Sequence, residues 1–376
     1  MARSGPILFI TRNFPPALGG IETITEELTQ HGVETGEKVV VVHIGQQPCS
    51  PSPTGLAAYR HFPGTDRWAA LFITTLVIPI MAMQYRPRLI VNIQVTTGLG
   101  SLIASRLLGI PYVVLCMGLE VLPGKSRLWR SWRGLVLRRA RRVISISRFT
   151  DSLAAGFGVK TENRRMVNPG TRLFPDLPKS DGRSQVFGPG SETVFVCLSL
   201  CRLVPRKGMD TMIEAISKVI RVRSDILYCI GGSGPDLPRL QALVEGKSLG
   251  KHVRFLGRIP DADMGRCYAK ADLFVLPSRA SLDPPDVEGF GIVFLEAAAC
   301  GTPSLGGASG GVPDAVLDGE TGFLVDPEDP ANIAEKILLL MSDRNLLARL
   351  SASASAHAKD STWAKARPRY FAAMLS

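Results

Sequence analysis

The stretch Asp286-Val-Glu-Gly-Phe-Gly-Ile-Val-Phe-Leu-Glu-Ala-Ala-Ala-Cys-Gly301 carries two carboxylates, Glu288 and Glu296, with seven residues between them. Its Gly-Phe-Gly turn precedes an apolar run and predicts the start of a helix, where backbone N–H groups are unpaired. Such a turn favours an anion or a group of hydroxyls, because the glycines have no Cβ to keep a ligand away. Glu296, about one turn into this helix, can accept hydrogen bonds from two neighbouring hydroxyls, such as those of a ribose. Two acids at this spacing are also common on solvated surfaces, so the neighbouring sequence decides between these interpretations.

Strand-like apolar runs alternate with helical patterns on both sides of this stretch. The predicted strands are 7–11, 39–43, 89–93, 112–115 and 143–146, then 193–200, 226–230, 253–255, 273–277, 303–305 and 322–325. Candidate helices of the first series lie at 21–31, 68–84, 98–108 and 129–139. A polar stretch rich in Gly, Pro and Ser, 175–191, separates the two series. The pattern predicts two doubly wound α/β domains, with a substrate in the cleft between them at the carboxyl ends of the strands.

Length and composition agree with two domains of an intracellular protein. The chain has 376 residues, 45% of them hydrophobic, which is enough for two ordinary cores. Its seven cysteines are dispersed without metal-ligand spacing, which indicates reduced cysteines in a cytosolic protein. The apolar run 6–11 is too short for a signal peptide and is expected to be the first strand. The run 68–83 is shorter than the roughly 20 residues that span a bilayer, which favours a buried helix over a membrane span and leaves interfacial docking as the lesser alternative.

Three motifs carry a resemblance to a known family. They are Leu276-Pro-Ser278, the stretch 286–296, and Ser309-Gly-Gly-Val-Pro313. This segment resembles the C-terminal half of the retaining glycosyltransferases of family four, which have the GT-B fold and a Glu-x7-Glu signature. The motifs are most similar to those of mannosyltransferases of the phosphatidylinositol mannoside pathway.

The resemblance implies an architecture and an activity. It implies two Rossmann-like domains that face a cleft, with residues 1–172 binding the acceptor and residues 173–361 binding the donor. The C-terminal segment, 362–376, would cross back and pack on the first domain. The implied enzyme is a hexosyltransferase that moves a sugar, with mannose from GDP-mannose favoured, to a glycan or lipid-linked acceptor with retained anomeric configuration. Glu288 would touch the sugar, Glu296 would bind the ribose, and the sugar hydroxyls would meet the backbone amides of Gly289, Phe290, Gly291 and Ile292.

A cationic loop predicts a site for the donor's diphosphate. In Leu200-Cys-Arg-Leu-Val-Pro-Arg-Lys-Gly-Met-Asp210, Arg202 and Lys207 can converge on one anion across a Pro-containing turn, and Arg206 is a third cation. The alternative is a pair of solvated surface cations, which the preceding apolar run disfavours. In the family the matching positions bind the diphosphate, so Arg202, Lys207 and Glu288 are the predicted catalytic residues.

Two glycine turns are further candidates for donor contacts. Gly19 and Gly20 lie between the first strand and a helix, where backbone amides can face a phosphate or sugar. Gly231-Gly-Ser-Gly234 follows a strand, but its spacing does not fit a dinucleotide fingerprint. In the family this turn borders the nucleotide, and the segment with Arg258 and Ile259 flanks the base.

One position departs from the family's pattern. Relatives carry a His-Gly-x-Glu segment where this chain has Met117-Gly-Leu-Glu120. The retaining mechanism asks no side chain to act as a nucleophile, so catalysis remains possible through positioning and electrostatic stabilisation of the leaving diphosphate. A sugar-nucleotide epimerase, a phosphorylase or a non-catalytic nucleotide-binding relative remain alternatives. The chain has no Asp-x-Asp pair after a strand, so we expect a metal-independent enzyme without a cofactor beyond the donor substrate.

The distribution of charge suggests a partner. The formal net charge is +11, and the segment 125–142 is rich in arginine, contains two tryptophans and has no acidic residue. On a helix, Leu128, Trp132, Leu135 and Val136 would share one side, which suits either an interfacial helix on an anionic membrane or a domain helix with a solvated basic face. No nucleic-acid motif accompanies the charge. We therefore expect a cytoplasmic protein, peripheral on the inner face of the membrane, with a lipid-linked acceptor.

Overall fold

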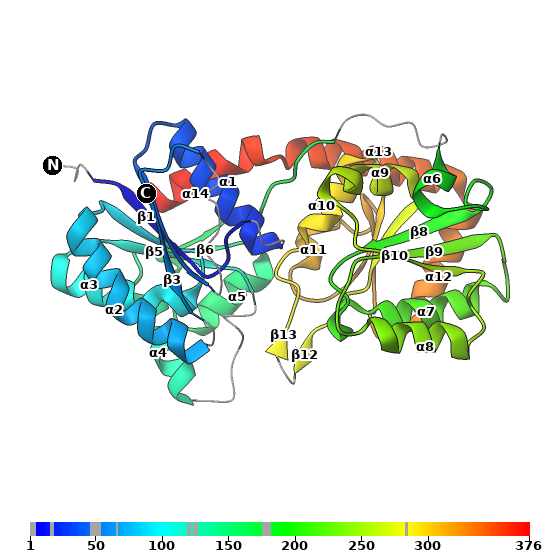
Figure 1. The fold of residues 1–376 in the computed structure, drawn as a ribbon. Coiled ribbons are helices and arrows are strands. Elements are labelled where there is room, and N and C mark those ends of the chain that lie inside the picture. Colours follow the sequence, from blue (N-terminus) through cyan, green and yellow to red (C-terminus); the bar gives the residue numbers. More distant parts are fainter. Residues whose placement is uncertain are drawn as a thin grey trace. The chain divides into compact units, whose positions relative to one another are not determined.

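The computed structural model describes residues 5–15, 19–45, 54–64, 67–118, 122, 127–174, 182–282 and 285–376. The chain divides into two compact units (Figure 1). Unit 1 comprises Met1–Pro169 and Trp363–Ser376, and unit 2 comprises Gly170–Thr362. The assignment of acceptor binding to residues 1–172 and of donor binding to residues 173–361 stays a prediction.

Unit 1 is built on a parallel sheet of seven strands in the order β3-β2-β1-β4-β5-β6-β7. Its strands are β1 (Ile7–Thr11), β2 (Val39–Gly45), β3 (Ala58–Pro63), β4 (Leu89–Asn92), β5 (Tyr112–Cys116), β6 (Arg142–Ser145) and β7 (Arg164–Met166). Its helices are α1 (Gly20–Glu34), α2 (Arg67–Tyr85), α3 (Gly98–Leu108), α4 (Arg127–Arg139), α5 (Arg148–Gly156) and α14 (Trp363–Leu375). Helices α2, α3 and α4 lie on one face of this sheet, and α1 and α14 on the other (Figure 1).

The C-terminal helix α14 belongs to unit 1, as the sequence predicted. Its Tyr370 is fully buried and donates a hydrogen bond to the Val167 carbonyl at 2.8 Å. Phe371 lies edge-on against His31 of α1, with 4.8 Å between the ring centroids. These contacts fix the last helix on the domain that the chain leaves at Pro169.

Unit 2 repeats the plan with six parallel strands in the order β10-β9-β8-β11-β14-β15. These are β8 (Phe195–Leu200), β9 (Ile226–Gly231), β10 (Val253–Gly257), β11 (Leu273–Leu276), β14 (Ser304–Gly307) and β15 (Gly322–Val325). A small antiparallel pair, β12 (Ser281–Leu282) and β13 (Pro285–Asp286), follows β11. The helices are α6 (Arg183–Phe187), α7 (Met209–Val219), α8 (Leu237–Gly246), α9 (Asp261–Lys270), α10 (Ile292–Ala299), α11 (Val312–Ala315), α12 (Pro330–Ser342) and α13 (Arg344–Asp360).

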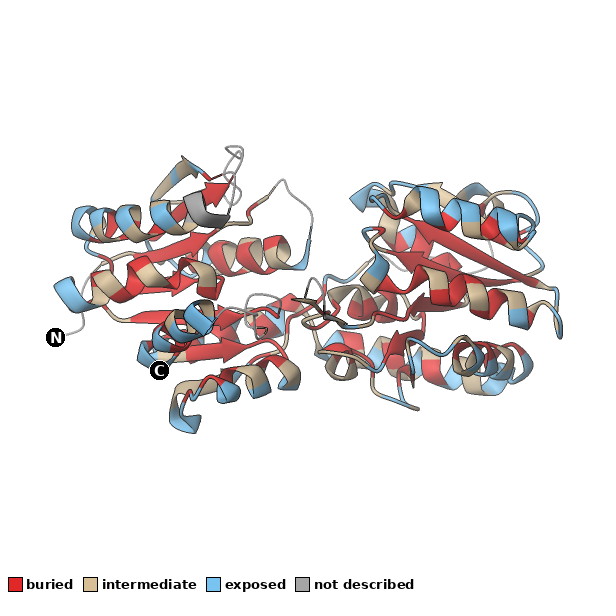
Figure 2. Cartoon of the chain, turned by 90° about the horizontal axis from the view of Figure 1, so that it is seen from below, coloured by how far each residue is buried: buried red, intermediate tan, exposed pale blue. Residues whose placement is uncertain are grey.

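Both sheets are buried and covered on each face. Figure 2 shows the central strands of each unit as buried, while the helices alternate between buried and exposed residues. In unit 2, α7, α8 and α12 lie on one face, and α9, α10 and α13 on the other (Figure 1). Parallel strands that are covered on both faces read as continuous apolar runs, which is why the sequence located the central strands.

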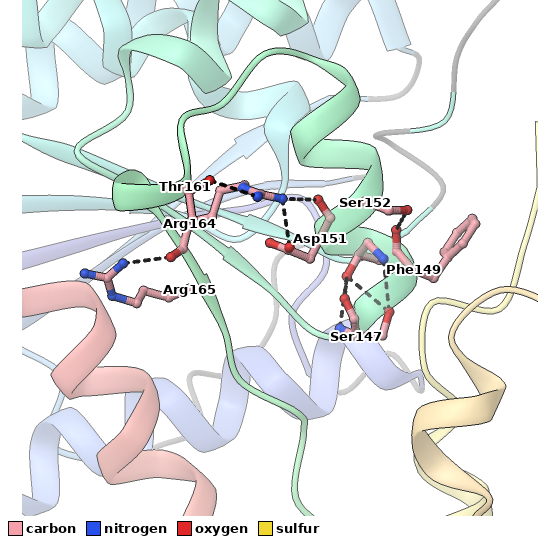
Figure 3. A network of polar contacts seen from close by, with 8 residues as sticks. Ser147, Phe149, Asp151, Ser152, Thr161, Arg164 and Arg165 are labelled. Atoms are coloured by element: carbon pink, nitrogen blue, oxygen red, sulfur yellow. Dashed lines mark hydrogen bonds and ion pairs between the residues drawn. The ribbon is translucent and has the colours of Figure 1, made fainter. Parts of the chain in front are cut away.

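Two edge strands were not predicted. Strand β3 reads Ala-Tyr-Arg-His-Phe-Pro and is only half-buried, and β7 reads Arg-Arg-Met. In Figure 3, Arg164 of β7 donates to the Asp151 carboxylate of α5 at 2.8 Å. Ser147 caps α5 by accepting a hydrogen bond from the Thr150 amide. These strands are held by polar contacts at the sheet edge, so they lack the apolar pattern of the central strands.

Helix α2 has one buried and one exposed side, although its sequence is mostly apolar. The expectation of a buried helix over 68–83 is wrong for one side of it. Four large apolar side chains with a spacing of three or four residues are 51–66% exposed: Phe72, Leu76, Ile80 and Met83. Among the described residues, no helix is long and apolar enough to cross a membrane.

The basic helix α4 buries only part of its apolar side. Trp132 packs against the core of unit 1 and Val136 is fully buried, but Leu128 and Leu135 are 73% and 37% exposed. The four residues therefore do not share one buried side. Lys125 and Ser126, at the start of the predicted basic segment, lie outside the described residues.

Candidate functional site

The candidate site of unit 2 lies at the topological switch point of its sheet. Strands β8 and β11 are neighbours in the sheet, but the chain continues from β8 to β9 on one side and from β11 to β14 on the other. Doubly wound sheets bind ligands at the point where the strand order reverses in this way. The loops after these two strands meet there, since the Arg279 N–H donates to the Arg206 carbonyl at 2.8 Å. Gly208 has a φ of 73°, and a Cβ on it would lie 2.1 Å from the Pro277 carbonyl oxygen. Only glycine allows the two loops to approach this closely.

Two cations of the loop after β8 contact the first signature carboxylate. Lys207 Nζ lies 2.5 Å and Arg206 Nη1 2.9 Å from Oε2 of Glu288. Arg206 also pairs through Nε with Asp286 at 2.8 Å. The side chains of Lys207, Arg206 and Glu288 are 11%, 20% and 15% exposed, so water screens these charges weakly.

The charge state of Glu288 follows from this pairing. Burial raises the pKa of its carboxyl, but the charges of Lys207 and Arg206 and their hydrogen bonds outweigh burial and lower it to about 2. Glu288 is therefore ionised at neutral pH. The sequence predicted that Glu288 contacts the sugar and that Lys207 contacts the diphosphate. In the structure these two residues and Arg206 form one cluster.

Arg202 does not join this cluster. Its side chain is exposed, and within the described parts of the chain no hydrogen bond or ion pair holds it. The structure instead brings Arg206 beside Lys207, because a short 3₁₀ turn, Pro205–Lys207, places these consecutive residues on the Glu288 side. The predicted convergence of Arg202 and Lys207 is thus not seen, and the role of Arg202 in binding stays a prediction.

The signature turn is anchored by the loop after β14. The Gly311 N–H donates to the Glu288 carbonyl at 2.9 Å, and Phe290 is 3% exposed. Gly291 has a φ of 95° and begins α10, so Gly289 and Ile292 flank the predicted helix start. Since the Phe290 side chain is buried, this residue can face a ligand only through its backbone.

The second signature carboxylate has two partners of its own. Tyr268 of α9 donates its hydroxyl to Oε2 of Glu296 at 3.0 Å, and Arg172 Nε lies 3.7 Å from Oε1. Burial raises the pKa of Glu296, which Arg172 and Tyr268 partly offset. Neither partner was singled out from the sequence, because Arg172 lies in the connecting segment and Tyr268 in a polar helix without a motif.

The glycine turn after β9 packs against the two neighbouring loops. A Cβ on Gly234 would lie 2.1 Å from the Leu203 carbonyl oxygen, and a Cβ on Gly231 would lie 3.0 Å from Ile259 Cγ1. Ile259 is half-buried and Arg258 is exposed. Close loop packing therefore accounts for these glycines, and their predicted contact with a nucleotide stays a prediction.

Unit 1 has a polar cluster at its own switch point, between β1 and β4. Gly19 and Gly20 start α1 there, and both are exposed. Asn13 donates to Glu22 Oε1 at 2.7 Å, and Gln94 donates to Asn13 Oδ1 at 2.9 Å. Asn13 and Gln94 were not identified from the sequence, although each lies two residues after the end of neighbouring parallel strands.

Met117, at the position of the family's histidine, directly follows β5 and is 5% exposed. A buried thioether cannot exchange a proton or accept a strong hydrogen bond. Glu120 lies outside the described residues. The next position, Gly118, has a φ of 136°.

Metal ligands are absent from the described parts of the chain, where no group of three or more His, Cys, Asp or Glu side chains could hold an ion. Asp286, one of the acids in the turn after β11, pairs with Arg206. Asp283 lies outside the described residues. Lys207 and Arg206, beside Glu288, are two positive charges that the described site offers to an anion.

Family comparisons match nearly the whole chain. The family described as glycosyl transferases group 1 matches residues 185–357, and the family described as glycosyl transferase 4-like domain matches residues 19–170. The chain is 32% identical to the GDP-mannose-dependent alpha-(1-6)-phosphatidylinositol monomannoside mannosyltransferase of Mycolicibacterium smegmatis. The alignment covers 98% of each chain.

Solved structures share the fold at lower identity. Sucrose-phosphate synthase from Thermosynechococcus elongatus superimposes with a TM-score of 0.83 at 22% identity, covering 98% of this chain and 97% of that one. The HepE protein of Anabaena, solved with UDP and glucose, superimposes with a TM-score of 0.81 at 20% identity, covering 99% and 100%. These likenesses establish the arrangement of strands and helices in the two units.

Proposed function

Because the chain is a glycosyltransferase of the family that includes the mycobacterial mannosyltransferase, with the GT-B fold, we propose that it transfers mannose from GDP-mannose to a phosphatidylinositol mannoside or a related lipid-linked acceptor. The relative's name supports both substrates, since it is named for GDP-mannose and for a mannosylated phosphatidylinositol. The same comparison favours transfer over an epimerase or a non-catalytic relative. Transfer retains the configuration at the anomeric carbon.

The observation that carries this proposal is the cluster of Lys207, Arg206 and Glu288 at the switch point of unit 2. The donor's diphosphate takes the two cations, which then no longer contact Glu288. Arg206 binds phosphate oxygens through its planar fork and Lys207 as a compact charge. Arg202, exposed on the same loop, adds a third cation to the diphosphate. Glu288 is released to accept hydrogen bonds from the hydroxyls of the transferred sugar.

The chemistry is carried by positioning and charge. The acceptor hydroxyl attacks the anomeric carbon from the face that the diphosphate leaves, and an oxygen of the leaving phosphate takes its proton. No side chain becomes a nucleophile or a base in this scheme, so the buried Met117 is compatible with it. Lys207 and Arg206 stabilise the charge that builds up on the leaving diphosphate. Because these two cations already face the diphosphate, the proposed reaction needs no metal ion.

Glu296 is proposed to bind the donor's ribose, and the turn of Gly231 and Gly234 to border the nucleotide. Arg258 and Ile259, directly after strand β10, flank the base. On unit 1, the Gly19–Gly20 turn faces the sugar or its phosphate. The acceptor is proposed to bind unit 1.

The first test is thermal stabilisation of the purified protein by GDP, UDP, ADP and NAD. A ligand at about 100 times its Kd stabilises a folded protein by about 2.7 kcal/mol, which is a measurable rise in Tm. We expect a selective rise with GDP that is lost in Lys207→Ala, and turnover of GDP-mannose by this variant reduced on the order of 10²–10³-fold. A rise with UDP alone would reassign the base. A rise with NAD alone, or near-normal turnover in Lys207→Ala, would contradict the proposed site.

A lipid-linked acceptor requires the enzyme to meet a membrane surface. We propose that unit 1 does so through the exposed apolar side of α2, formed by Phe72, Leu76, Ile80 and Met83. Helix α3 packs against both α2 and the basic helix α4, so arginines lie in the same layer of helices as this apolar side. Exposed apolar side chains and arginines in one layer of helices match the acyl boundary and the head groups of an anionic bilayer. The proposed location is therefore peripheral, on the cytoplasmic face of the membrane.

A further inference from the structure

The segment that enters unit 2 is fixed on that unit by its first residues. The Thr171 N–H donates to the Ser361 carbonyl at 2.8 Å, and Thr171 also forms a parallel bridge with Thr362. Three residues on, Phe174 lies against α9, where a Cβ on Gly265 would be 2.4 Å from its ring. Residues 171–174 therefore form a short strap with a defined position on unit 2.

This strap places a guanidinium at the second signature carboxylate. The Arg172 guanidinium carbon lies 4.8 Å from the centre of the Phe174 ring, and Nη2 lies 3.6 Å from the sulfur of Met264. Its Nε lies 3.7 Å from Oε1 of Glu296. Stacking on an aromatic ring fixes the plane of a guanidinium, so the position of Arg172 relative to Glu296 is defined from both sides.

The other oxygen of Glu296 has a different partner. Tyr268 is fully buried and donates its hydroxyl to Oε2 at 3.0 Å. An ionised carboxylate has about four acceptor positions. The Tyr268 hydroxyl occupies one of them, and the ion pair with Arg172 takes at most one more. One position on each oxygen thus remains for a further donor, which fits a pair of neighbouring hydroxyls.

We infer that Arg172 is a positioning residue of the donor site, which together with Tyr268 orients Glu296 so that its two oxygens accept from the 2′ and 3′ hydroxyls of ribose. This inference rests on the proposed function, because it takes a nucleotide ribose as the ligand of Glu296. The Arg172 side chain contacts the Glu296 carboxylate and the Phe174 ring, and it acts on the nucleotide only through Glu296.

The charges around Glu296 make the inferred recognition of ribose depend on pH. Burial raises the pKa of Glu296, Arg172 and Tyr268 lower it, and Asp261 at the start of α9 raises it. On the other side of α10, α13 contributes Ala354 and Ala358. Removing Arg172 therefore raises the pKa of Glu296 further, and the carboxyl gains a proton at a higher pH. A protonated carboxyl has less capacity to accept from two hydroxyls.

The test compares the binding of GDP and 2′-deoxy-GDP, with UDP and 2′-deoxy-UDP in parallel, by calorimetry between about pH 5 and about pH 8. The wild type is expected to prefer the ribonucleotide. In Arg172→Ala this preference falls about tenfold near pH 5 and recovers towards pH 8, because a hydrogen bond to a charged group is lost on protonation. Arg172→Lys, which keeps the charge, is expected to restore most of the preference.

Arg266→Ala is the matched control. Arg266 is a cation of α9 that is 48% exposed and pairs with Asp263, so its removal changes the charge nearby without touching Glu296. We expect it to leave the preference unchanged. If Arg172→Ala keeps the full preference for ribose at every pH, the inference is overturned while the proposed function stands. If the wild type binds no nucleotide, the proposed function fails. If the wild type binds the ribonucleotide and the 2′-deoxyribonucleotide equally, Glu296 does not recognise the ribose and the inference is overturned.

Discussion

Glu288 is a buried carboxylate that two cations share. Removing one partner of a buried ion pair leaves an uncompensated charge, which costs several kcal/mol. In the proposed exchange the incoming phosphates neutralise the two cations, and the hydroxyls of the sugar replace them as hydrogen-bond partners of Glu288. Arg206 keeps Asp286 as a second partner during such an exchange.

The pairing of Glu288 predicts how stability depends on pH. Its folded pKa, about 2, lies below its ordinary value of 4.5, so the stabilisation is full above about pH 4.5 and is lost as pH falls towards 2. The shift corresponds to on the order of 3 kcal/mol. We expect Glu288→Gln to lower the free energy of unfolding by about this amount at neutral pH, and the gap to the wild type to close on acidification. Urea unfolding at several pH values measures it.

The control for this prediction is Glu335→Gln on α12, whose carboxylate is 68% exposed beside Lys336. An exposed ion pair contributes little, so this variant should stay within about 0.5 kcal/mol of the wild type at every pH. A gap for Glu288→Gln that is constant down to acid pH would show that its carboxylate is not ionised between the two cations.

At the residue scale, the sequence predicted some partners and missed others for identifiable reasons. Glu288 and Lys207 were both singled out, and they are in contact. The five-residue spacing of Arg202 and Lys207 predicts a shared anion, but the 3₁₀ turn directs the consecutive side chains of Arg206 and Lys207 to Glu288. Arg172, one of the two partners of Glu296, lies more than a hundred positions away in a segment without a pattern, and only folding brings it close.

At the scale of elements, buried parallel strands were predictable and polar edges were not. Strand β1 has the predicted bounds, and β9 extends one residue beyond them. The predicted helix after the Gly-Phe-Gly turn is α10. The bounds of edge strands β3 and β7 depend on pairing with a neighbour, which the local sequence does not encode.

The contact between the loops after β8 and β11 predicts the effect of one glycine. In Gly208→Ala the new Cβ would meet the Pro277 carbonyl, and φ is positive, so the loops must separate. We expect a loss of at least about 2 kcal/mol in the free energy of unfolding and a loss of stabilisation by the nucleotide.

Gly246→Ala at the end of α8 is the control, because a Cβ there has open space. Alanine favours a helix over glycine, so this variant should be as stable as the wild type or more stable by up to about 1 kcal/mol. Unfolding in urea and the nucleotide-induced rise in Tm are read on both variants. Equal behaviour of the two variants would contradict the assigned loop contact.

On the scale of the whole molecule, the family and the fold predicted from the motifs are confirmed. The match covers both units, although the three motifs on which the resemblance rests lie in unit 2. For unit 1, the alternation of strand-like and helical patterns was sufficient to predict a domain with the same architecture as unit 2. The surface of unit 1 was less predictable, since the sequence alone does not show which side of an apolar helix faces the core.

The exposed apolar side of α2 predicts that the whole enzyme binds to membrane vesicles. We expect the wild type to co-sediment at low salt with vesicles that contain phosphatidylglycerol, and Leu76→Ser to bind them about tenfold more weakly. A buried leucine side chain contributes about 1.5–3 kcal/mol, and its loss is felt only if Leu76 enters the bilayer. Val222→Ser is the matched control, because Val222 is 70% exposed but belongs to unit 2.

The arginines of α4 act on the same equilibrium through charge. Arg130→Gln with Arg139→Gln should weaken binding to anionic vesicles by about 1 kcal/mol for each cation, and this loss should shrink as salt is added. Binding to neutral phosphatidylcholine vesicles should depend on Leu76 but not on these arginines. Sedimentation of Leu76→Ser at the level of the wild type would contradict insertion of α2. A wild type that stays in solution at low salt would mean that the lipid acceptor reaches the enzyme without a membrane contact of unit 1.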